Sequence, residues 1–470
     1  MRKTKIICTI GPSSMSEEKL REMMLAGMNV TRFNFSHADH AEQGMKFDRV
    51  RKVSEELGLF VATLLDTKGP EVRLGDFENG EAMLEENQLF TLTTEEIQGT
   101  KDRATISYKE LTKDIKTGMT ILIDDGKIGM TIEKIEGTEV ICRVNNGGKI
   151  SNHKGINVPG ATLSMPFISQ KDHDDIVFGA QIGVDYIAAS FTRSKEDVLA
   201  VRKILVDNGS KAKIIAKIEN TQGIQNMDEI LEAADGIMVA RGDLGVEVPF
   251  EDVPVFQKEL IKKCVMAGKI VVTATQMLES MITNPRPTRA EVTDVANAIY
   301  DGTTAIMLSG ESAAGKYPVE AIQTMARIAE RTEQDIDYVS RMSKIDKGVK
   351  PDVTTAISHA TCTTAMDLNA EAIITVSMSG FTTEMVSRYK PNCTIVGCSV
   401  DPRVCRQMNL AWGVQPLLID KAETEEELFT KATSEAKKAG YIKTGDTVVL
   451  TAGLPLGVSG TTNMIRVIEA

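Results

Sequence analysis

Long apolar runs, paired cysteines and an excess of positive charge are all missing from this chain of 470 residues. No run reaches the roughly 18 apolar residues that a membrane helix needs, and the apolar stretch after the basic start, residues 6–10, is too short for a secretory signal. The seven cysteines are scattered without a CxxC pair, which favours reduced thiols and predicts a cytoplasmic protein. Lys and Arg number 54 against 66 Asp and Glu, and the net charge of −12 argues against nucleic acid and membrane partners.

What the chain does have is a repeated pattern of apolar strand-length runs, each followed by an amphipathic stretch of helix length. Strict alternation of strands and helices is typical of parallel sheets. Eight such units, spread over roughly 250 residues, favour an α/β fold built on a (β/α)8 TIM barrel. We therefore expect barrel strands at residues 5–10, 29–35, 60–66, 185–191, 213–219, 236–241, 269–275 and 304–309.

Two regions depart from the barrel pattern. Residues 69 to about 166 contain short apolar runs separated by turn signals such as Asp124-Asp125-Gly126. They predict a small all-β domain inserted after the third strand, above the mouth where barrel enzymes hold their sites, in the position of a lid. The polar stretch between Gln334 and Pro351 is interpreted as a linker to a separate α/β domain. We expect three domains. They are the barrel (residues 1–68 and 168–343), the inserted domain (residues 69–167) and the C-terminal domain (residues 344–470).

Charged residues end two neighbouring apolar strands. Lys217 and Glu219 are two positions apart on a strand, so they point the same way, and Asp243 follows the next strand. Charges at the end of a buried strand are costly unless they form a site. Two carboxylates and an amine suit a divalent cation that holds a phosphorylated anion.

Polar side chains also follow the second and third strands. Arg32, Asn34 and Ser36 share one face of the second strand's end. A solvent-facing edge strand would give the same pattern, but that explanation is weaker within a parallel barrel. Asp66 ends the third strand and could be a helix cap, and the Gly-Pro pair that follows could mark a domain boundary. Neither explains why more charges follow within residues 68–73.

Three weaker signals stay open at the level of local sequence. The Gly-rich turn 241–245 would attract a carboxylate or phosphate, although many strand-to-helix turns look similar. Thr273 and Thr275 share a face at the end of the seventh strand, where Thr is common in any case. The hydroxyl-rich tract 377–384 is either an N-cap or a phosphate cradle.

Two other patterns are set aside. Residues 310–316 fit GxxxxGK, but Tyr317 stands where a P-loop needs Ser or Thr to reach Mg²⁺. His37 and His40 follow the second strand, but no third ligand is spaced for zinc.

Together these motifs resemble those of the pyruvate kinase family, along essentially the whole chain. The most specific stretches are residues 8–12, 34–37, 65–73, 214–219, 238–245, 273–278 and 284–291. The resemblance implies transfer of the phosphoryl group of phosphoenolpyruvate to ADP, giving ATP and pyruvate, with Mg²⁺ (or Mn²⁺) and K⁺. It also implies a small β-barrel as the inserted domain, a C-terminal regulatory domain with a phosphorylated allosteric effector, and a cytoplasmic homotetramer.

The resemblance further implies roles in the reaction for individual residues. Mg²⁺ would bind Glu219 and Asp243. K⁺ would bind Asn34, Ser36, Asp66 and the carbonyl of Thr67. The transferring phosphoryl group would face Arg32, Arg73 and Lys217.

The remaining implied roles concern the ends of the substrates and the effector. The backbone of Ala240, Arg241 and Gly242 would receive the substrate carboxylate, and Thr275 would lie near the carbon that is protonated, with a water relay in preference to Thr275 alone. The nucleotide would contact Asn34, His37, Arg73 and Lys154. The effector, with a monophosphate favoured, would contact Ser377, Ser379, Gly380, Thr382 and Thr383.

Two departures and one diagnostic residue qualify the resemblance. Ala38 stands where the family usually has Gly, beside the implied nucleotide contact. The chain ends at Ala470, so we expect it to lack the extra C-terminal domain of some bacterial members. Glu71 matches the family members that need K⁺, whereas K⁺-independent members carry Lys there.

Two other functions were weighed. A metal-dependent lyase or aldolase acting on an enolpyruvate-type substrate would use the same barrel and cation, but would need neither the lid nor the K⁺ pocket. A non-catalytic effector sensor would be expected to have lost Lys217, Glu219 or Asp243, and all three are present.

Overall fold

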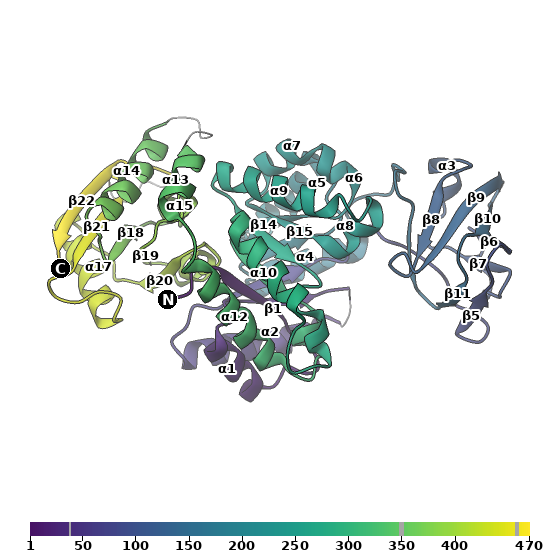
Figure 1. Ribbon diagram of the computed structural model, residues 1–470, viewed down its shortest axis with the longest axis horizontal. Coiled ribbons are helices and arrows are strands. Elements are labelled where there is room, and N and C mark those ends of the chain that lie inside the picture. The colour runs from purple at the N-terminus through teal and green to yellow at the C-terminus, as the bar shows by residue number, and fades with distance from the viewer. Residues whose placement is uncertain (37–38, 347–351, 456–459) are drawn as a thin grey trace.

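Eight parallel strands form a closed barrel at the centre of the computed structural model, which describes all residues except 37–38, 347–351 and 456–459 (Figure 1). Around the barrel the strands follow the order β1-β17-β16-β15-β14-β13-β3-β2. They are β1 (Lys5–Thr9), β2 (Val30–Asn34), β3 (Ala62–Asp66), β13 (Tyr186–Ala189), β14 (Lys213–Ile218), β15 (Gly236–Ala240), β16 (Ile270–Ala274) and β17 (Ala305–Leu308). All eight expected barrel strands are therefore confirmed, with ends that differ by only one or two residues.

The barrel strands are buried along most of their length, as expected when a parallel sheet is covered on both faces. Helices on the outside supply that cover, and most begin at a capping side chain. Ser169 and Thr288, for example, each complete a capping box. The helices are α1 (Glu17–Ala26), α2 (His40–Glu56), α4 (Gln170–Ile182), α5 (Lys195–Asp207), α6 (Thr221–Gln225), α7 (Met227–Ala233), α8 (Arg241–Glu247), α9 (Val253–Ala267), α10 (Arg289–Asp301), α11 (Gly310–Ala313) and α12 (Pro318–Glu333), with the 3₁₀ turn η1 (Glu279–Ile282).

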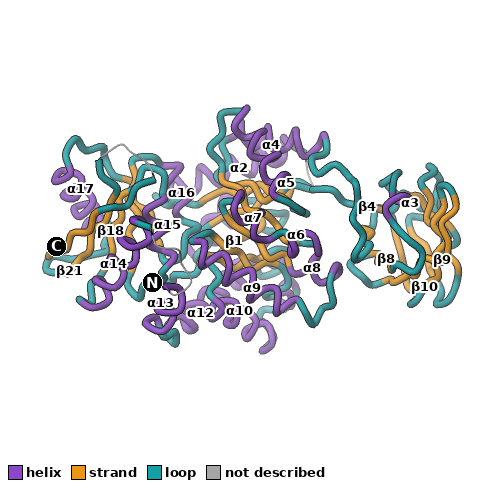
Figure 2. Tube along the Cα trace, turned by 90° about the horizontal axis from the view of Figure 1, so that it is seen from above, coloured by secondary structure: helices purple, strands orange, loops and turns teal. Residues whose placement is uncertain are grey.

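The segment between β3 and α4 forms a separate β-structure that extends from the mouth of the barrel (Figures 1 and 2). Seven strands pair in the order β4-β12-β8-β9-β10-β6-β7, and β5 pairs with β11. A bridge between Leu74 and Ile106 joins the two edge strands and closes the sheet as a small barrel. The elements are β4 (Val72–Arg73), β5 (Glu81–Leu84), β6 (Leu89–Thr93), β7 (Arg103–Thr105), α3 (Leu111–Asp114), β8 (Thr120–Ile123), β9 (Ile128–Glu136), β10 (Glu139–Val144), β11 (Gly148–Ser151) and β12 (Gly155–Asn157).

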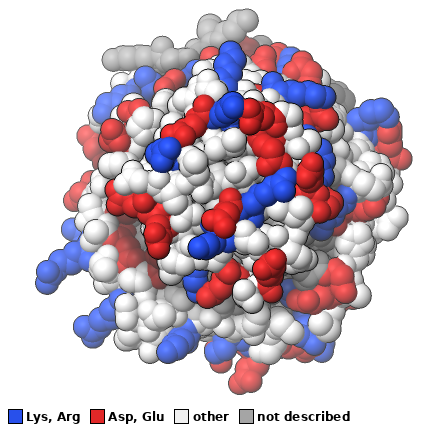
Figure 3. All heavy atoms as spheres, turned by 90° about the vertical axis from the view of Figure 1, so that its right-hand side faces the viewer, with Lys and Arg blue, Asp and Glu red and all other residues white. Residues whose placement is uncertain are grey.

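The outer face of this inserted structure carries Lys and Arg side chains interspersed with Asp and Glu (Figure 3). Several form pairs across strands, such as Arg143 with Glu133, at 2.5 Å. Exposed pairs of this kind add little stability. They do keep charges of one sign from gathering on this face.

The C-terminal region contains a five-stranded sheet in the order β20-β19-β18-β21-β22, in which only β22 is antiparallel to its neighbour. Its strands are β18 (Ala372–Val376), β19 (Thr394–Ser399), β20 (Val414–Leu418), β21 (Thr447–Ala452) and β22 (Met464–Glu469). Its helices are α13 (Tyr338–Asp346), α14 (Val353–Asp367), α15 (Phe381–Arg388), α16 (Pro402–Met408) and α17 (Glu425–Lys438). The separate α/β unit is therefore confirmed.

One expectation about this region is wrong. Part of the stretch interpreted as a linker forms helix α13, because Met342 and Ile345 lie on one helical face and are buried in the C-terminal core. Charged residues around them, such as Arg341 and Lys344, obscure this periodicity in the sequence. The end of the expected linker, residues 347–351, lies outside the described residues.

The C-terminal unit packs against the amino-terminal end of the barrel, opposite the inserted structure (Figure 1). Tyr186 donates a hydrogen bond to the carbonyl of Gln407 (2.6 Å), and Arg406 pairs with Asp185 (3.0 Å). The carboxyl ends of the strands therefore stay open toward the inserted structure. Within the described residues, no helix combines the length and apolar character needed to cross a membrane.

Candidate active site

Four charged side chains meet at the carboxyl ends of β2, β3 and β14. Arg32 donates to the Asp66 carboxylate from Nε (2.5 Å), and Lys217 Nζ lies 3.2 Å from the other Asp66 oxygen. Lys217 Nζ also lies 2.9 Å from Glu219 Oε1, so these two side chains do point the same way. Asp66 and Glu219 are about 1% exposed. The strand-end residues Arg32, Asp66, Lys217 and Glu219 are thus brought together as one buried cluster.

Ser190 connects this cluster and was missed by the sequence reasoning. Its hydroxyl accepts a hydrogen bond from Lys217 Nζ (2.8 Å) and lies 3.0 Å from Asp66 Oδ1 and 2.7 Å from the Thr67 carbonyl. It follows the buried strand β13, so the signal that identified Asp66, a polar residue directly after an apolar strand, was also available here.

The charges in the cluster shift one another's protonation. Burial alone would lower the pKa of Lys217, but the carboxylates of Asp66 and Glu219 raise it above its ordinary value. Burial raises the pKa of Asp66, and the charges of Arg32 and Lys217 outweigh this and lower it. Lys217 is therefore held as a cation in a buried site, where its field is only weakly screened.

The two oxygens of Glu219 have different partners. Its Oε2 accepts a hydrogen bond from the backbone N–H of Phe191 (2.6 Å), whereas Oε1 is buried and has the ion-pair contact with Lys217 but no well-directed hydrogen bond from a described residue. Burial, and then the nearby charge of Asp243, raise the pKa of Glu219 to about 8. A cation between Glu219 and Asp243 would relieve both the lost hydration and the repulsion.

The donor set fits Mg²⁺ in particular. Both candidate ligands are carboxylates, and no described residue donates a hydrogen bond to Asp243. Among the described residues, no three His, Cys, Asp or Glu side chains converge as a closed metal site. Mg²⁺ commonly takes one or two protein carboxylates and completes its shell with substrate oxygens and water.

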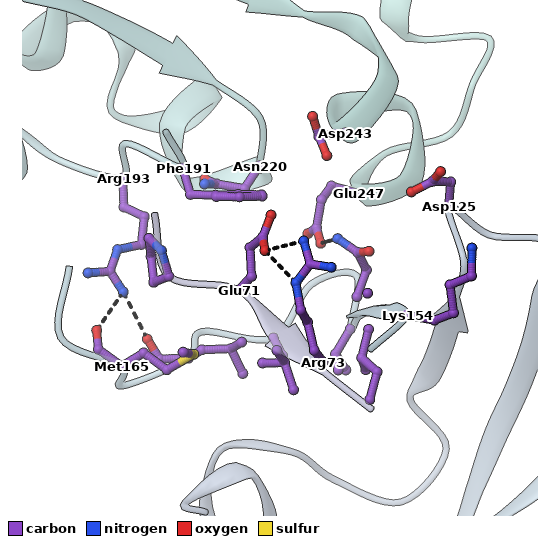
Figure 4. Close-up of a pocket in the computed structure, with 18 of the residues that line it drawn as sticks. Glu71, Arg73, Asp125, Lys154, Met165, Phe191, Arg193, Asn220, Asp243 and Glu247 are labelled. Atoms are coloured by element: carbon purple, nitrogen blue, oxygen red, sulfur yellow. Dashed lines mark hydrogen bonds and ion pairs between the residues drawn. The ribbon is translucent and has the colours of Figure 1, made fainter. Parts of the chain in front are cut away.

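A cavity of 280 Å³ lies between the barrel mouth and the inserted structure (Figure 4). Asp243 and Glu247 of α8 border it from the barrel, and Arg73 and Lys154 from the inserted structure. Few contacts join its two walls. They include a hydrogen bond from Asn157 to Glu247 (2.9 Å) and two from Arg193 to main-chain carbonyls.

The expected nucleotide residues divide between this cavity and the barrel. Arg73 pairs with Glu71 (2.6 Å) and Lys154 with Asp124 (2.8 Å), both on the cavity wall. Asn34 lies instead at the end of β2, where its side chain accepts a hydrogen bond from the Ser36 amide (3.0 Å). His37 and Ala38 lie outside the described residues.

The turn after β15 is tied to Thr275. Gly242 donates its N–H to the Thr275 hydroxyl (2.8 Å), which donates to the Ala274 carbonyl (2.6 Å). Arg241 turns away and pairs with Asp294 at 2.6 Å, so its side chain fixes the turn. Thr275 itself has a φ of 66°, a strained conformation for a β-branched residue and one typical of functional sites.

Two family models match this chain. "Pyruvate kinase, barrel domain" covers residues 1–322, and "Pyruvate kinase, alpha/beta domain" covers residues 355–468.

The chain belongs to the pyruvate kinase family.

Individual relatives agree over the full length. A pyruvate kinase of Clostridium acetobutylicum is 50% identical over 469 residues, covering 99% of both chains. One of Geobacillus stearothermophilus is 48% identical and covers 99% of this chain and 80% of its own length. The crystal structure of a pyruvate kinase from Cryptosporidium parvum superposes with a TM-score of 0.95 at 39% identity, covering 100% of this chain and 96% of that one.

Membership gives the reaction and the class of enzyme. Pyruvate kinases are phosphotransferases that convert phosphoenolpyruvate and ADP to pyruvate and ATP in glycolysis, and the family uses Mg²⁺ and K⁺. The matches do not support the lyase or aldolase alternative. They do not assign roles to individual residues, which depend on the geometry above.

The oxygens that the pyruvate kinase resemblance links to K⁺ lie at two adjacent strand ends. Asn34 and Asp66 are direct partners in the pairing of β2 with β3. Thr67 follows Asp66, and Ser36 lies two residues beyond Asn34. Both Asp66 oxygens already contact Arg32, Ser190 or Lys217, so a cation here would share them.

The region that the resemblance links to a pyruvate kinase effector also contains a cavity, of 220 Å³. Ser377 and Thr382 line it, together with Lys421, a cation that the sequence reasoning missed. The Thr383 hydroxyl instead lies 2.7 Å from that of Thr375, inside the fold. Gly380, with a φ of +84°, forms the turn before α15, and Ser379 precedes it; neither lines the cavity.

Proposed function

We propose that the cluster of Arg32, Asp66, Lys217 and Glu219 is where this enzyme transfers the phosphoryl group from phosphoenolpyruvate to ADP. One observation carries the proposal. Arg32 and Lys217 converge on the buried carboxylate of Asp66, and Lys217 also contacts Glu219, at the carboxyl ends of barrel strands that face a cavity. Barrel enzymes hold their active sites at this end.

Arg32 and Lys217 would neutralise charge on the moving phosphoryl group. Phosphoryl transfer depends on positioning and on charge stabilisation more than on a covalent nucleophile. Asp66 contacts both cations from one carboxylate, and the Ser190 hydroxyl accepts a hydrogen bond from Lys217 beside the same carboxylate. The two cations are therefore positioned before substrate binds, and little reorganisation is needed during transfer.

Glu219 and Asp243 would hold Mg²⁺ (or Mn²⁺). When bound, the ion would act as a Lewis acid toward the substrate oxygens. The substrate carboxylate would lie at the turn of Ala240, Arg241 and Gly242. The Gly242 N–H points at Thr275 in the free protein, so it would have to exchange or share this partner.

Thr275 would deliver a proton through water. Its hydroxyl already donates to a carbonyl and accepts from Gly242, and a Thr hydroxyl is a weak acid. A water molecule held by this hydroxyl is better placed to protonate the enolate carbon.

The inserted structure (residues 69–167) would act as a lid. It would close over the barrel (residues 1–68 and 168–343). Arg73 and Lys154 would then contact the nucleotide phosphates, with Asn34 and His37 on the barrel side. The small number of contacts across the cavity supports a movable lid, whose closure would exclude water from the phosphoryl group.

A monovalent cation would complete the site. Asn34, Ser36, Asp66 and Thr67 supply oxygens at adjacent strand ends, and K⁺ there would balance the acidic groups.

The C-terminal domain (residues 344–470) would bind a phosphorylated effector in the cavity of Ser377 and Thr382. Effector binding would alter the apparent KM for phosphoenolpyruvate through linkage between distinct sites.

The assembly would be a homotetramer in the cytoplasm. Strand β22 is an edge of the C-terminal sheet, with Val467 44% exposed, and such an edge can pair with another chain. The seven cysteines form no disulfide, which suits a reducing compartment.

Replacement of Lys217 with Met tests the proposal. We expect kcat for pyruvate formation to fall by about 10²–10³-fold or more, because a preorganised charge at the phosphoryl group is lost. Metal-dependent exchange of the methyl protons of pyruvate should persist, since it needs no phosphoryl transfer. Lys203→Met, on the exposed side of α5, is the matched control and should behave as the parent.

Near-normal kinase turnover in Lys217→Met would refute the assignment. Loss of both activities, together with a changed melting temperature, would show that Lys217 maintains the structure of the site. Exchange measured by NMR in deuterated water and kinase activity measured by coupled assay separate these cases.

A further inference from the structure

A third cavity, of 570 Å³, lies at the junction of the barrel with the C-terminal domain. Met266 and Gly302, on its wall, lie four residues before β16 and three before β17, so the cavity opens at the amino-terminal end of the barrel, opposite the proposed active site. Helix α13 forms another wall and lies between the barrel helices and the C-terminal sheet (Figures 1 and 2). No role proposed above uses this cavity.

Arg341 of α13 reaches the cavity with part of its guanidinium unused. Its Nη2 donates to the carbonyls of Ile299 (3.2 Å) and Tyr300 (3.0 Å) at the end of α10. Its Nη1 is buried and has no hydrogen-bond partner among the described residues. A buried donor without an acceptor is costly, so this atom indicates a missing acceptor.

Lys390 approaches the same cavity from the C-terminal domain. It is 3% exposed, and its only hydrogen bond to a described residue is a long one, 3.5 Å, to the Thr303 carbonyl. Its Nζ also lies 4.9 Å from the centre of the Trp412 ring. Burial, and then the charge of Arg341, lower the pKa of Lys390 well below its ordinary value.

The nearby carboxylates are already engaged. Asp301 pairs with Lys258, and Asp335 accepts a hydrogen bond from the Tyr300 hydroxyl (2.8 Å). Asp337 accepts one from the Ser340 amide (2.9 Å), and Glu333 accepts from two backbone amides near the amino terminus. The cavity therefore holds two basic side chains that form no ion pair with a described residue, next to carboxylates that already have partners. This combination favours an anion.

We propose that this cavity binds a small organic phosphate, with the phosphate between Arg341 and Lys390 and the carbon portion against Val265, Met266 and Ile345. The Arg341 guanidinium and the Lys390 amine, which the charge of a bound phosphate would hold as an ammonium, suit the several oxygens of a phosphate. Lys262 and Lys344 also line the cavity and add positive charge. The ligand would link the barrel to the C-terminal domain, at a site separate from the cavity of Ser377.

Trp412 allows a direct test, because it is the only tryptophan of the chain and lies beside Lys390. The full-length protein is titrated with ribose 5-phosphate, ribose and inorganic phosphate while Trp412 emission is followed, and calorimetry gives the stoichiometry. All titrations use a Ser377→Glu background, which places a negative charge in the other cavity. The variants are Arg341→Met, Lys344→Met and Lys263→Met, the last a control that faces outward from α9 and pairs with Asp228.

We expect saturable binding of ribose 5-phosphate at one site per chain, with weaker binding of inorganic phosphate and none of ribose. Arg341→Met should raise Kd by roughly tenfold or more, because a charge-assisted hydrogen bond is lost. Lys344→Met should weaken binding less, and Lys263→Met should leave it unchanged. Lys344 is exposed, so this variant remains informative if Arg341→Met fails to fold.

Three results would overturn the proposal. One is the absence of a saturable signal with ribose 5-phosphate at millimolar concentration. Another is an affinity equal to the parent's in both folded Arg341→Met and Lys344→Met, which would place binding elsewhere. The third is inorganic phosphate binding as tightly as ribose 5-phosphate, which would remove the role of the apolar wall.

Discussion

At the scale of single residues, the proposed active site is a set of buried charges that depend on one another. Asp66 contacts Arg32 and Lys217, and Lys217 contacts Glu219. Removing one partner leaves the next as an uncompensated buried charge, which costs more than an exposed ion pair contributes. Single substitutions here should therefore be read from kinetics and from stability together.

The proposed Mg²⁺ ligands give the first residue-scale prediction. Glu219→Gln and Asp243→Asn should each raise the Mg²⁺ concentration needed for half-maximal activity by roughly tenfold or more, because a hard anionic ligand is lost. The measurement is a Mg²⁺ titration of initial rates. Glu232→Gln, an exposed carboxylate on α7, is the control. If either ligand variant titrates like the parent, that ligand assignment is wrong.

A second residue-scale prediction concerns Lys5, which is 1% exposed at the start of β1 and donates to the Val414 carbonyl. Burial, and then the charge of Arg2, lower the pKa of Lys5 to about 7. In the unfolded chain its pKa is near 10.5. Between these values the unfolded state binds one more proton, so the free energy of unfolding should rise with pH by at most about 1.4 kcal/mol per unit.

Urea denaturation between pH 7 and pH 10 measures this slope. Lys5→Met removes the titrating group and should flatten the curve relative to the parent, whereas Lys203→Met, at an exposed site, should not. Identical slopes in the parent and in Lys5→Met would contradict the prediction.

At the scale of elements, the register of parallel strands decides which residues meet. Asp66 of β3 pairs with Asn34 of β2 on one side and with Ala188 of β13 on the other. This register places Thr67 and Ser190 beside one another at the strand ends. Because all barrel strands run the same way, every carboxyl end reaches the same mouth. Residues far apart in the sequence thus gather without any long-range motif.

The proposed K⁺ pocket belongs to this scale. With tetramethylammonium as the sole monovalent cation, activity should fall by roughly a hundredfold, because a positive charge next to the phosphoryl site is missing. Glu71→Lys should reduce the need for K⁺, since its ammonium would supply that charge. Full activity of the parent in tetramethylammonium would refute the pocket.

At the scale of the whole molecule, the barrel lies between two units with different tasks. The inserted structure meets the carboxyl ends of the strands, and the C-terminal unit packs at the opposite end (Figure 1). The cavity at Ser377 is therefore far from the chemistry in the fold. An effector there can act only by changing how the units or the subunits pack.

Effector binding gives the prediction at this scale. Ribose 5-phosphate, AMP or fructose 1,6-bisphosphate should lower the apparent KM for phosphoenolpyruvate, and Ser377→Glu should abolish this effect while leaving the basal rate unchanged. Ser377 is a better position than Thr383, whose hydroxyl is engaged with Thr375 inside the fold. Activation curves at fixed ADP measure the effect. Equal activation of Ser377→Glu, or none of the parent, would show that the effector site is misplaced.

Much of the architecture could be predicted from the sequence, because local patterns specify it. The eight barrel strands were located to within one or two residues, since each is a buried apolar run ended by turn or charged residues. Lys217 and Glu219 were expected to point the same way from strand alternation alone, and they lie 2.9 Å apart. Helix α13 was missed, because its buried face consists of a few residues within a charged stretch.

The sequence by itself determined four features: the strand-helix alternation, the insertion after β3, the separate C-terminal unit and the chemistry available at the strand ends. Each of these depends on residues that lie close together in the chain. Only the tertiary structure decided that Ser190 joins Lys217 to Asp66 and that Thr383 turns inward. It also decided that Arg341 and Lys390 line one cavity and form no ion pair with a described residue. Those facts depend on packing between elements tens or hundreds of residues apart. No local pattern specifies which partner a buried polar group finds there.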